Sequence, residues 1–222
     1  MLKITFMGAG STVFVRNVIG DCMCTPGLRD AQIALYDIDA QRLEDSRIIL
    51  EALNRNINES RARIRTYLGE ENRKEALRQA RFVINAIQVG GYDPCTITDF
   101  EVPKKYGLRQ TIADTLGVGG VFRALRTIPV MLDFARDMEE VCPDAWFLNY
   151  TNPMAMLTWA AIKYGGVRTL GLCHGEIHGE MQIAEVLGLK DRHELDVTCA
   201  GLNHQTWYIS VKHKGEEMIG KL

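Results

Sequence analysis

A cysteine and a histidine stand side by side in the segment GLCHGE, and a second histidine follows an apolar run in GLNHQ. A thiolate and an imidazole are ligands for borderline divalent metals, whereas magnesium prefers oxygen donors. Cys173 and His204 would supply two ligands, too few for a closed zinc site, so substrate oxygens and water would complete the shell. The alternative is a free cysteine buried in the core beside a capping histidine, and composition alone favours that alternative.

The elements that must position these residues follow a regular alternation. Apolar residues recur near helical spacing in residues 39–57 and 123–141. Between such stretches stand short apolar segments of the kind that forms strands buried between two helical layers. These segments are LKITFM, QIALYD, RIRTYL, RFVINAIQ, AWFLNY and VRTLGLC. The alternation predicts an α/β fold, a doubly wound, mostly parallel Rossmann-type sheet in residues 1–194.

Two stretches depart from this alternation. Residues 89–121 form a long, glycine-bearing excursion after the fourth strand, and excursions of this length more often cover an active site than merely link elements. Just past it, Arg123 and Arg126 share a helix face, where such a pair is usually solvated or ion-paired. Residues 195–222 contain two strand-like runs, which predict a hairpin and the truncated beginning of a second α+β domain.

Two glycines follow the first predicted strand in ITFMGAGST. Gly8 and Gly10 would let the backbone approach a pyrophosphate, and the helix that begins near Ser11 would offer free N–H groups. The third glycine of the dinucleotide fingerprint is absent, because position 13 is valine. Gly-x-Gly alone is a weak signal, which the preceding strand and following helix strengthen.

An aspartate ends the second predicted strand in ALYDID. Asp37 stands where a carboxylate would receive the ribose hydroxyls, although its distance from the glycines exceeds the usual ~20 residues. Together with Asp39 it would repel a 2′-phosphate, so NAD is favoured over NADP, with Arg42 as the opposing feature. The alternative makes Asp37 a helix-capping or turn residue.

Amide side chains end the fourth and fifth predicted strands. Asn149 and Asn152 lie in FLNYTNPM, before Pro153, where ligands bind in open α/β sheets. Asn152 could instead cap the next helix, which asparagine does often. Asn85, at the end of the fourth strand, has the same two interpretations.

Composition narrows the function classes. The 222 residues are 46% hydrophobic and 24% charged with a formal net charge of −2, which gives no basic surface for nucleic acid or anionic membrane. No apolar stretch reaches the roughly 18 residues of a membrane span, and the N-terminus lacks a signal peptide pattern. The six cysteines show no compact disulfide spacing and are expected to be reduced thiols, so the predicted location is the cytoplasm.

The combination of segments resembles glycoside hydrolase family 4, and within it the bacterial α-galactosidases. The resemblance covers essentially the whole chain, with the segments in the same order. They are KITFMGAGSTVFVRNVIGD, IALYDIDAQRLEDS, VINAIQVGGYDPCTITDFE, LRQTIADTLGVGGVFRALRTIP, LNYTNPMAM, GLCHG and CAGLNH. The resemblance implies hydrolysis of α-galactosides with NAD and a divalent metal, typically Mn²⁺, as an exception to the two-carboxylate rule of glycosidases. The sugar of the substrate could also be galacturonate or glucose, so α-galacturonides and α-glucosides remain alternatives to α-galactosides.

The family mechanism implies transient oxidation. NAD⁺ takes a hydride from C3 of the sugar, and the resulting ketone acidifies the proton on C2. A metal on O2 and O3 stabilises the enediolate, the C1–O bond is eliminated, water adds and the hydride returns. By position, the metal ligands fall on Cys173 and His204, the proton donor on His174 and a substrate contact on Asn152. Histidine suits that role, since it keeps a useful protonated fraction near neutral pH.

The candidate cofactor-binding residues are Gly8, Gly10, Ser11, Asp37 and Asn85, and the candidate substrate-binding residues are Asn149 and Asn152. Family members are much longer than this chain, and the resemblance implies that the full-length form is a homo-oligomer. The resemblance also implies that the C-terminal half of each family chain supplies the tyrosine that acts as the base. The 222 residues alone are therefore expected to be inactive or nearly so. Two alternatives are a lactate- or malate-type dehydrogenase and a non-catalytic NAD-binding module.

Overall fold

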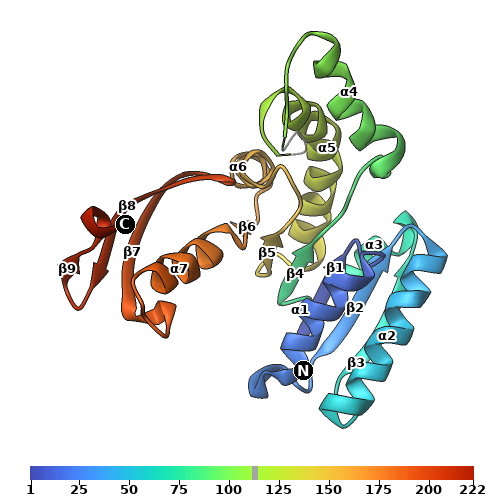
Figure 1. Cartoon of the computed structure of the whole chain (residues 1–222). Helices are drawn as coiled ribbons and strands as arrows, with labels where there is room; N and C mark the ends of the chain where they lie inside the picture. Colours follow the sequence, from blue (N-terminus) through green and yellow to red (C-terminus); the bar gives the residue numbers. More distant parts are fainter. Residues whose placement is uncertain (112–114) are drawn as a thin grey trace. The chain divides into compact units, whose positions relative to one another are not determined.

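The computed structural model describes residues 1–111 and 115–222, which divide into two units, Met1–Gly171 and Leu172–Leu222 (Figure 1). All six strands expected in the first unit form. They are β1 (Lys3–Met7), β2 (Gln32–Asp37), β3 (Arg63–Leu68), β4 (Phe82–Asn85), β5 (Trp146–Asn149) and β6 (Arg168–Gly171). They pair in parallel in the order β3-β2-β1-β4-β5-β6, which confirms the Rossmann-type prediction. The strand order reverses between β1 and β4, where ligands bind in such sheets.

Helices cover both faces of this sheet. The helices of the first unit are α1 (Thr12–Cys24), α2 (Ala40–Asn58), α3 (Arg73–Leu77), α4 (Ile97–Lys105), α5 (Gly117–Val141) and α6 (Met154–Tyr164), of which α4 packs on α5. Ile4 and Phe6 of β1 pack with residues of α1 and α2, whereas Met7 packs with residues of α3, α5 and α6. Successive side chains of a strand point to opposite faces, so a sheet buried on both faces needs nearly continuous apolar strands.

The excursion at residues 89–121 is largely helical where the structure describes it. A π-helical turn at Gly91–Thr96 leads into α4, and α5 begins at Gly117. Residues 112–114 lie outside the described part. That the excursion covers an active site stays a prediction.

The second unit contains one helix on a small antiparallel sheet. Its elements are α7 (Gly175–Val186), β7 (Leu195–Leu202), β8 (Gln205–His213) and the short β9 (Glu216–Glu217). β7 and β8 pair antiparallel, which confirms the predicted hairpin. The predicted boundary after residue 194 falls inside this unit, because α7 packs on β7 and both therefore belong to one unit. As a boundary between functional domains, residue 194 stays a prediction.

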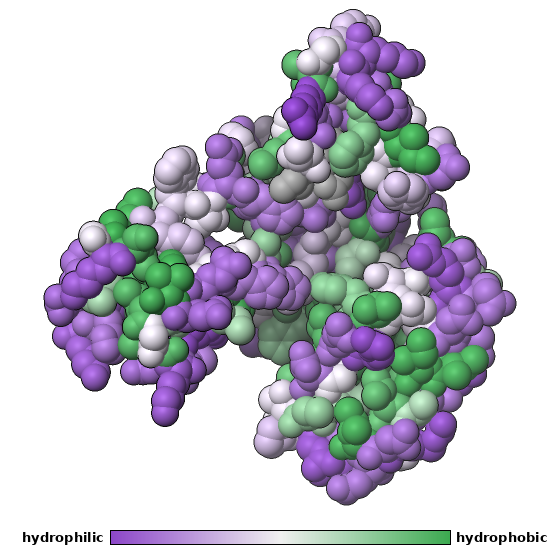
Figure 2. All heavy atoms as spheres, in the orientation of Figure 1, coloured by the Kyte–Doolittle hydropathy of each residue, from purple (hydrophilic) through white to green (hydrophobic). Residues whose placement is uncertain are grey.

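Apolar side chains gather at the surface of the second unit (Figure 2). Ile177, Met181 and Val186 of α7 are among its exposed large apolar residues. One α-helix on a three-stranded sheet encloses too little volume to bury every apolar side chain. Within the described residues, no helix combines the length and apolarity that crossing a bilayer requires.

The core contains one cysteine whose chemistry can be predicted. All six cysteines are unpaired, and Cys142 is 5% exposed among apolar neighbours. Burial raises the pKa of the Cys142 thiol to about 11. Because the thiolate is the nucleophile, we expect iodoacetamide at about pH 8 to alkylate Cys142 at least ~10-fold more slowly than the exposed Cys24. Mass spectrometry of peptides from native and urea-unfolded chain would measure this, and equal labelling in the native chain would contradict it.

Candidate active site

The turn between β1 and α1 is packed so closely that two positions have no room for a side chain. Gly8 has φ +85°, a conformation that favours glycine, and a Cβ there would lie 2.7 Å from the carbonyl oxygen of Ala86. A Cβ on Gly10 would lie 2.9 Å from Oδ2 of Asp37. The turn therefore presents bare backbone at the point where the strand order reverses, as a pyrophosphate site requires.

The first turn of α1 leaves its N–H groups without side-chain caps. Ser11 is the N-cap residue but its side chain makes no capping hydrogen bond, and the first turn contains no acidic residue. The helix is 13 residues long. Its N-terminus therefore carries a partial positive charge that no carboxylate of its own first turn offsets, so an anion is favoured there.

Asp37 holds the glycine turn as well as ending β2. Its Oδ2 accepts the N–H of Gly10 at 2.6 Å, and its Oδ1 accepts the N–H groups of Ile38 at 2.8 Å and Asp39 at 2.9 Å. Asp37 therefore acts as a turn residue in the structure. It does not cap α2, because the N-cap residue of that helix is Asp39, whose side chain accepts the N–H of Arg42. A carboxylate offers about four acceptor positions, so contact with a ribose hydroxyl stays compatible with these bonds.

The two asparagines at the ends of β4 and β5 bind each other. Asn85 donates to Oδ1 of Asn149 at 3.0 Å, and both residues are fully buried. Asn149 in turn donates to the carbonyl oxygen of Thr151 and to the hydroxyl of Thr158. The Oδ1 atom of Asn85 is buried without a hydrogen-bond partner among residues 1–111 and 115–222. Most of the hydrogen-bonding capacity that was predicted to bind a ligand is therefore used within the protein, and this oxygen is what Asn85 can still offer to a donor.

Asn152 lies in the connection between β5 and α6. It precedes a cis peptide bond to Pro153, and Pro153 rather than Asn152 is the N-cap residue of α6. The alternative in which Asn152 caps this helix is therefore wrong. Its side chain is half-buried beyond the carboxyl end of β5, the position expected for a ligand contact.

In the second unit, Cys173 directly precedes the N-terminal end of α7. The cysteine is half-buried, and its Sγ accepts the N–H of Gly175 at 3.3 Å. His174 is the N-cap residue of this 12-residue helix and is exposed. Its ring centroid lies 5.8 Å from that of His178, one turn further along. The partial positive charge at a helix N-terminus stabilises an anion, and a cysteine that binds a metal does so as the anionic thiolate.

His204 lies in the two-residue turn that joins β7 to β8, exposed to solvent. Its φ of +64° is uncommon for any residue except glycine, although histidine tolerates it better than most. Such conformations cost free energy and cluster at functional sites. Within the described residues, no group of three or more Cys, His, Asp or Glu side chains gathers as a metal site. The two-ligand site at Cys173 and His204 stays a prediction.

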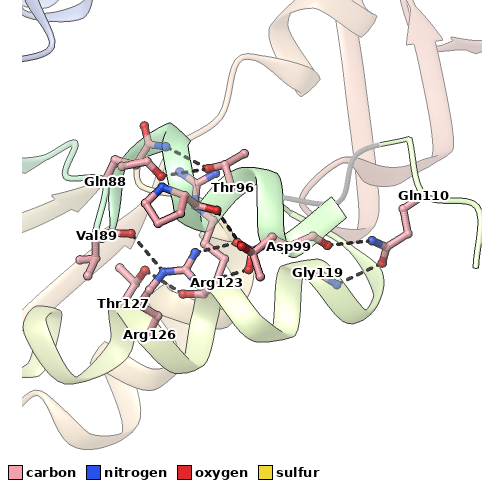
Figure 3. A network of polar contacts seen from close by, with 12 residues as sticks. Gln88, Val89, Thr96, Asp99, Gln110, Gly119, Arg123, Arg126 and Thr127 are labelled. Carbon is pink, nitrogen blue, oxygen red and sulfur yellow. Dashed lines mark hydrogen bonds and ion pairs between the residues drawn. The ribbon is translucent and has the colours of Figure 1, made fainter. Parts of the chain in front are cut away.

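One polar network joins α4 to α5, and the sequence indicated Arg126 but not its partners (Figure 3). Arg126 of α5 donates to both carboxylate oxygens of Asp99 in α4, at 2.6 and 3.2 Å, and to the carbonyl oxygen of Val89. Gln110 donates to the carbonyl oxygen of Asp99 and accepts the N–H of Gly119 in the first turn of α5. Arg126 was predicted to be either solvated or ion-paired, and the structure shows that it is ion-paired with Asp99.

The strand order, the glycine turn and the uncapped α1 define a Rossmann-type fold. A sequence model of the family 4 glycosyl hydrolases matches residues 3–189, and the chain belongs to that family. The match does not favour the lactate- or malate-type dehydrogenase considered as an alternative.

Individual proteins that resemble the chain belong to the same group of glycosidases. The chain is 54% identical over 222 residues to an α-galactosidase of Bacillus subtilis (strain 168), covering 100% of the chain and 50% of the relative. It is 44% identical over 220 residues to an α-galactosidase of Rhizobium meliloti (strain 1021), covering 99% and 44%. A 6-phospho-β-glucosidase of Thermotoga maritima, solved with manganese, NAD⁺ and glucose-6-phosphate, superimposes with a TM-score of 0.82 at 27% identity, covering 99% of this chain and 52% of that one. The chain thus spans about half the length of these relatives.

Proposed function

We propose that this chain is the cofactor- and metal-binding part of an α-galactosidase that uses NAD⁺ and a divalent metal, with manganese as the first candidate. The observation that carries the proposal is the 54% identity to an α-galactosidase along all 222 residues. Identity at that level supports the same sugar more strongly than the fold does, because one fold hosts many functions.

The residues of the first unit fit NAD⁺. The bare backbone at Gly8 and Gly10 and the uncapped N-terminus of α1 suit the pyrophosphate, and the carboxylate of Asp37 suits the ribose hydroxyls. The unpartnered, buried Oδ1 of Asn85 would accept a hydrogen bond from a cofactor amide. Bound NAD⁺ would supply a hydride acceptor that returns the hydride at the end of the cycle.

The residues of the second unit fit a borderline divalent metal. Cys173 and His204 are the thiolate and imidazole donors of the same compact unit, and the N–H of Gly175 already points at the sulfur. A bound metal would supply Lewis-acid stabilisation of negative charge on sugar oxygens.

The chain's own side chains would then carry two roles in the chemistry. His174, exposed at the N-terminus of α7, would donate a proton to the departing glycosidic oxygen. Asn152 would hydrogen-bond a sugar hydroxyl beyond the end of β5. The Asn85–Asn149 pair would hold the two strand ends in place rather than contact the sugar through Asn149.

The proposal extends to location and assembly. Six unpaired cysteines suit the reducing cytoplasm, where NAD⁺ is available. The family resemblance suggests a homo-oligomer for the full-length form, and light scattering after size-exclusion chromatography would measure its mass.

The test uses the chain itself and a chimera in which it replaces the matched half of the Bacillus subtilis relative. We expect the 222-residue chain to bind NAD⁺ saturably in calorimetry. We expect the chimera to hydrolyse 4-nitrophenyl α-galactoside in the presence of a thiol reductant, and to lose activity when NAD⁺ or Mn²⁺ is omitted. His174→Ala should lower kcat about 10²–10⁴-fold, the contribution of a positioned acid.

Two outcomes would contradict the proposal. Hydrolysis that continues after NAD⁺ is removed by charcoal treatment would exclude the redox route. Failure of the chain to bind NAD⁺ at all, with circular dichroism showing it folded, would exclude its assignment as the cofactor-binding part. 4-Nitrophenyl α-galacturonide and α-glucoside serve as matched substrates, and turnover faster than that of the galactoside would overturn the choice of sugar.

A further inference from the structure

In the second unit, the side chain of a tyrosine in the sheet fills the space beside a glycine of the helix. Gly179 lies in the middle of α7, and a Cβ built there would lie 2.7 Å from Cζ of Tyr208 in β8 and would overlap its hydroxyl oxygen. Real Cβ atoms do not approach other atoms so closely, so the position accepts only glycine while the ring stays in place. The ring of Tyr208 therefore lies directly on the helix backbone.

A hydrogen bond fixes the same contact along the helix axis. The hydroxyl of Tyr208 donates to the backbone carbonyl oxygen of Glu176, one turn before Gly179, at 3.0 Å. Burial, with smaller effects of Cys199, Glu180 and Glu176, raises the pKa of Tyr208, so the phenol keeps its proton and remains a donor. The ring contact and the hydrogen bond together specify both the distance between α7 and β8 and their relative shift along the helix.

A second anchor lies on the next residue of the helix. Arg192, in the connection between α7 and β7, donates to Glu180 at 2.5 Å, and both side chains are mostly buried. Because Glu180 follows Gly179, α7 is held at two neighbouring residues, one by Tyr208 of β8 and one by Arg192. Rotation of the helix about its axis would break one anchor or the other.

We infer that Gly179 and Tyr208 are positioning residues, which set the N-terminus of α7, with Cys173 and His174, relative to the turn that carries His204. Gly179 lies four residues into α7 from Gly175, or about 6 Å along its axis. Tyr208 lies four residues beyond His204, or about 13 Å along an extended strand. The contact thus joins the helix that follows Cys173 to the strand that follows His204. The inference rests on the proposed function that makes Cys173 and His204 ligands.

The test measures Co²⁺ binding by the 222-residue chain through the near-ultraviolet charge-transfer absorption of a cobalt–thiolate bond. Gly179→Ala should weaken Co²⁺ binding at least ~10-fold, the lower end for contacts that orient metal ligands. Tyr208→Phe, which keeps the ring and removes the donor, should weaken it by a smaller factor. The double variant should lose less than the product of the two, because removal of the hydroxyl relieves the overlap with the added methyl group. Gly220→Ala is the matched control, since a Cβ there meets nothing within 4 Å.

Two further variants separate this inference from the proposed function. Cys173→Ser and His204→Asn should abolish the absorption band, and asparagine accepts the backbone conformation of His204. If these two variants lose Co²⁺ while Tyr208→Phe keeps the affinity and spectrum of the unmodified chain, the inference is overturned and the metal site stands. If neither ligand variant changes binding, the metal site is wrong and the inference falls with it. Should Gly179→Ala not fold, Tyr208→Phe decides the question alone.

Discussion

Gly8→Ala is expected to destabilise the first unit by about 3 kcal/mol and to abolish NAD⁺ binding. The methyl group would lie 2.7 Å from the carbonyl oxygen of Ala86, 2.8 Å from its carbonyl carbon and 2.9 Å from Cα of Ile87. All three are backbone atoms of the segment that follows β4, so no side-chain rotation can make room. The φ of +85° adds strain for any residue with a Cβ. The chain can relieve both only by moving the turn, and the turn is where the pyrophosphate would bind.

Chemical unfolding followed by circular dichroism would measure the loss of stability, and calorimetry the loss of NAD⁺ binding. Gly27→Ala is the matched control, because a Cβ at Gly27 meets nothing within 4 Å. Its free energy of unfolding should stay within about 0.5 kcal/mol of the unmodified chain. NAD⁺ binding by Gly8→Ala at unchanged affinity would place the cofactor away from this turn.

The fold could be predicted because its main signal is local. Strands buried on both faces must be largely apolar at successive residues, and β2 buries Ile33, Ala34, Leu35 and Tyr36 in succession. Parallel strands also need long connections, so the helical stretches between them fixed the class before any contact was known. The end of the first unit at Gly171 could not be predicted in the same way. It depends on the packing of α7 against β7, which lie apart in the sequence.

The candidate site was predicted less completely, because residue type does not reveal a partner. Asn85 and Asn149 stand at strand ends as ligand-binding amides do, yet they bind each other across 64 residues of sequence. Asp37 was predicted as a ribose contact, with a turn residue as the alternative, and its bond to the N–H of Gly10 shows that it serves the turn. Spacing can place a polar group at a site, but tertiary contacts decide how many of its hydrogen bonds remain for a ligand.

Arg126 illustrates the same limit and leads to the second large expected effect. The sequence left it as solvated or ion-paired, and its partner Asp99 is 27 residues away in a different helix. Asp99 is 1% exposed and Arg126 is 24% exposed, so the carboxylate depends on the guanidinium for its compensation. The hydrogen-bonded carboxylate of Asp99 raises the pKa of Arg126, so the arginine stays charged throughout the accessible range of pH.

Arg126→Ala is therefore expected to destabilise the first unit by about 3–5 kcal/mol, the cost of leaving a buried charge without its partner. Asp99→Ala together with Arg126→Ala should cost less than Arg126→Ala alone, because the double variant leaves no unpaired carboxylate. Chemical unfolding of the three variants, Asp99→Ala included, would measure the coupling. The order of the single and double variants distinguishes a buried charge from simple loss of packing, since lost packing would make the double variant the least stable.

The control pair lies on the same helix. Lys104 and Glu101 of α4 form an ion pair three residues apart, with side chains 73% and 53% exposed. Lys104→Ala should change the free energy of unfolding by no more than about 0.5 kcal/mol, because solvent screens an exposed pair.

The Asp99–Arg126 pair also joins α4 to α5. Gln110 adds a second connection, because it donates to the carbonyl oxygen of Asp99 and accepts the N–H of Gly119 in the first turn of α5. Loss of the pair should therefore also loosen the N-terminus of α5, which hydrogen exchange at Gly119 would report as faster exchange. Unchanged exchange there, with stability lost, would confine the role of the pair to α4.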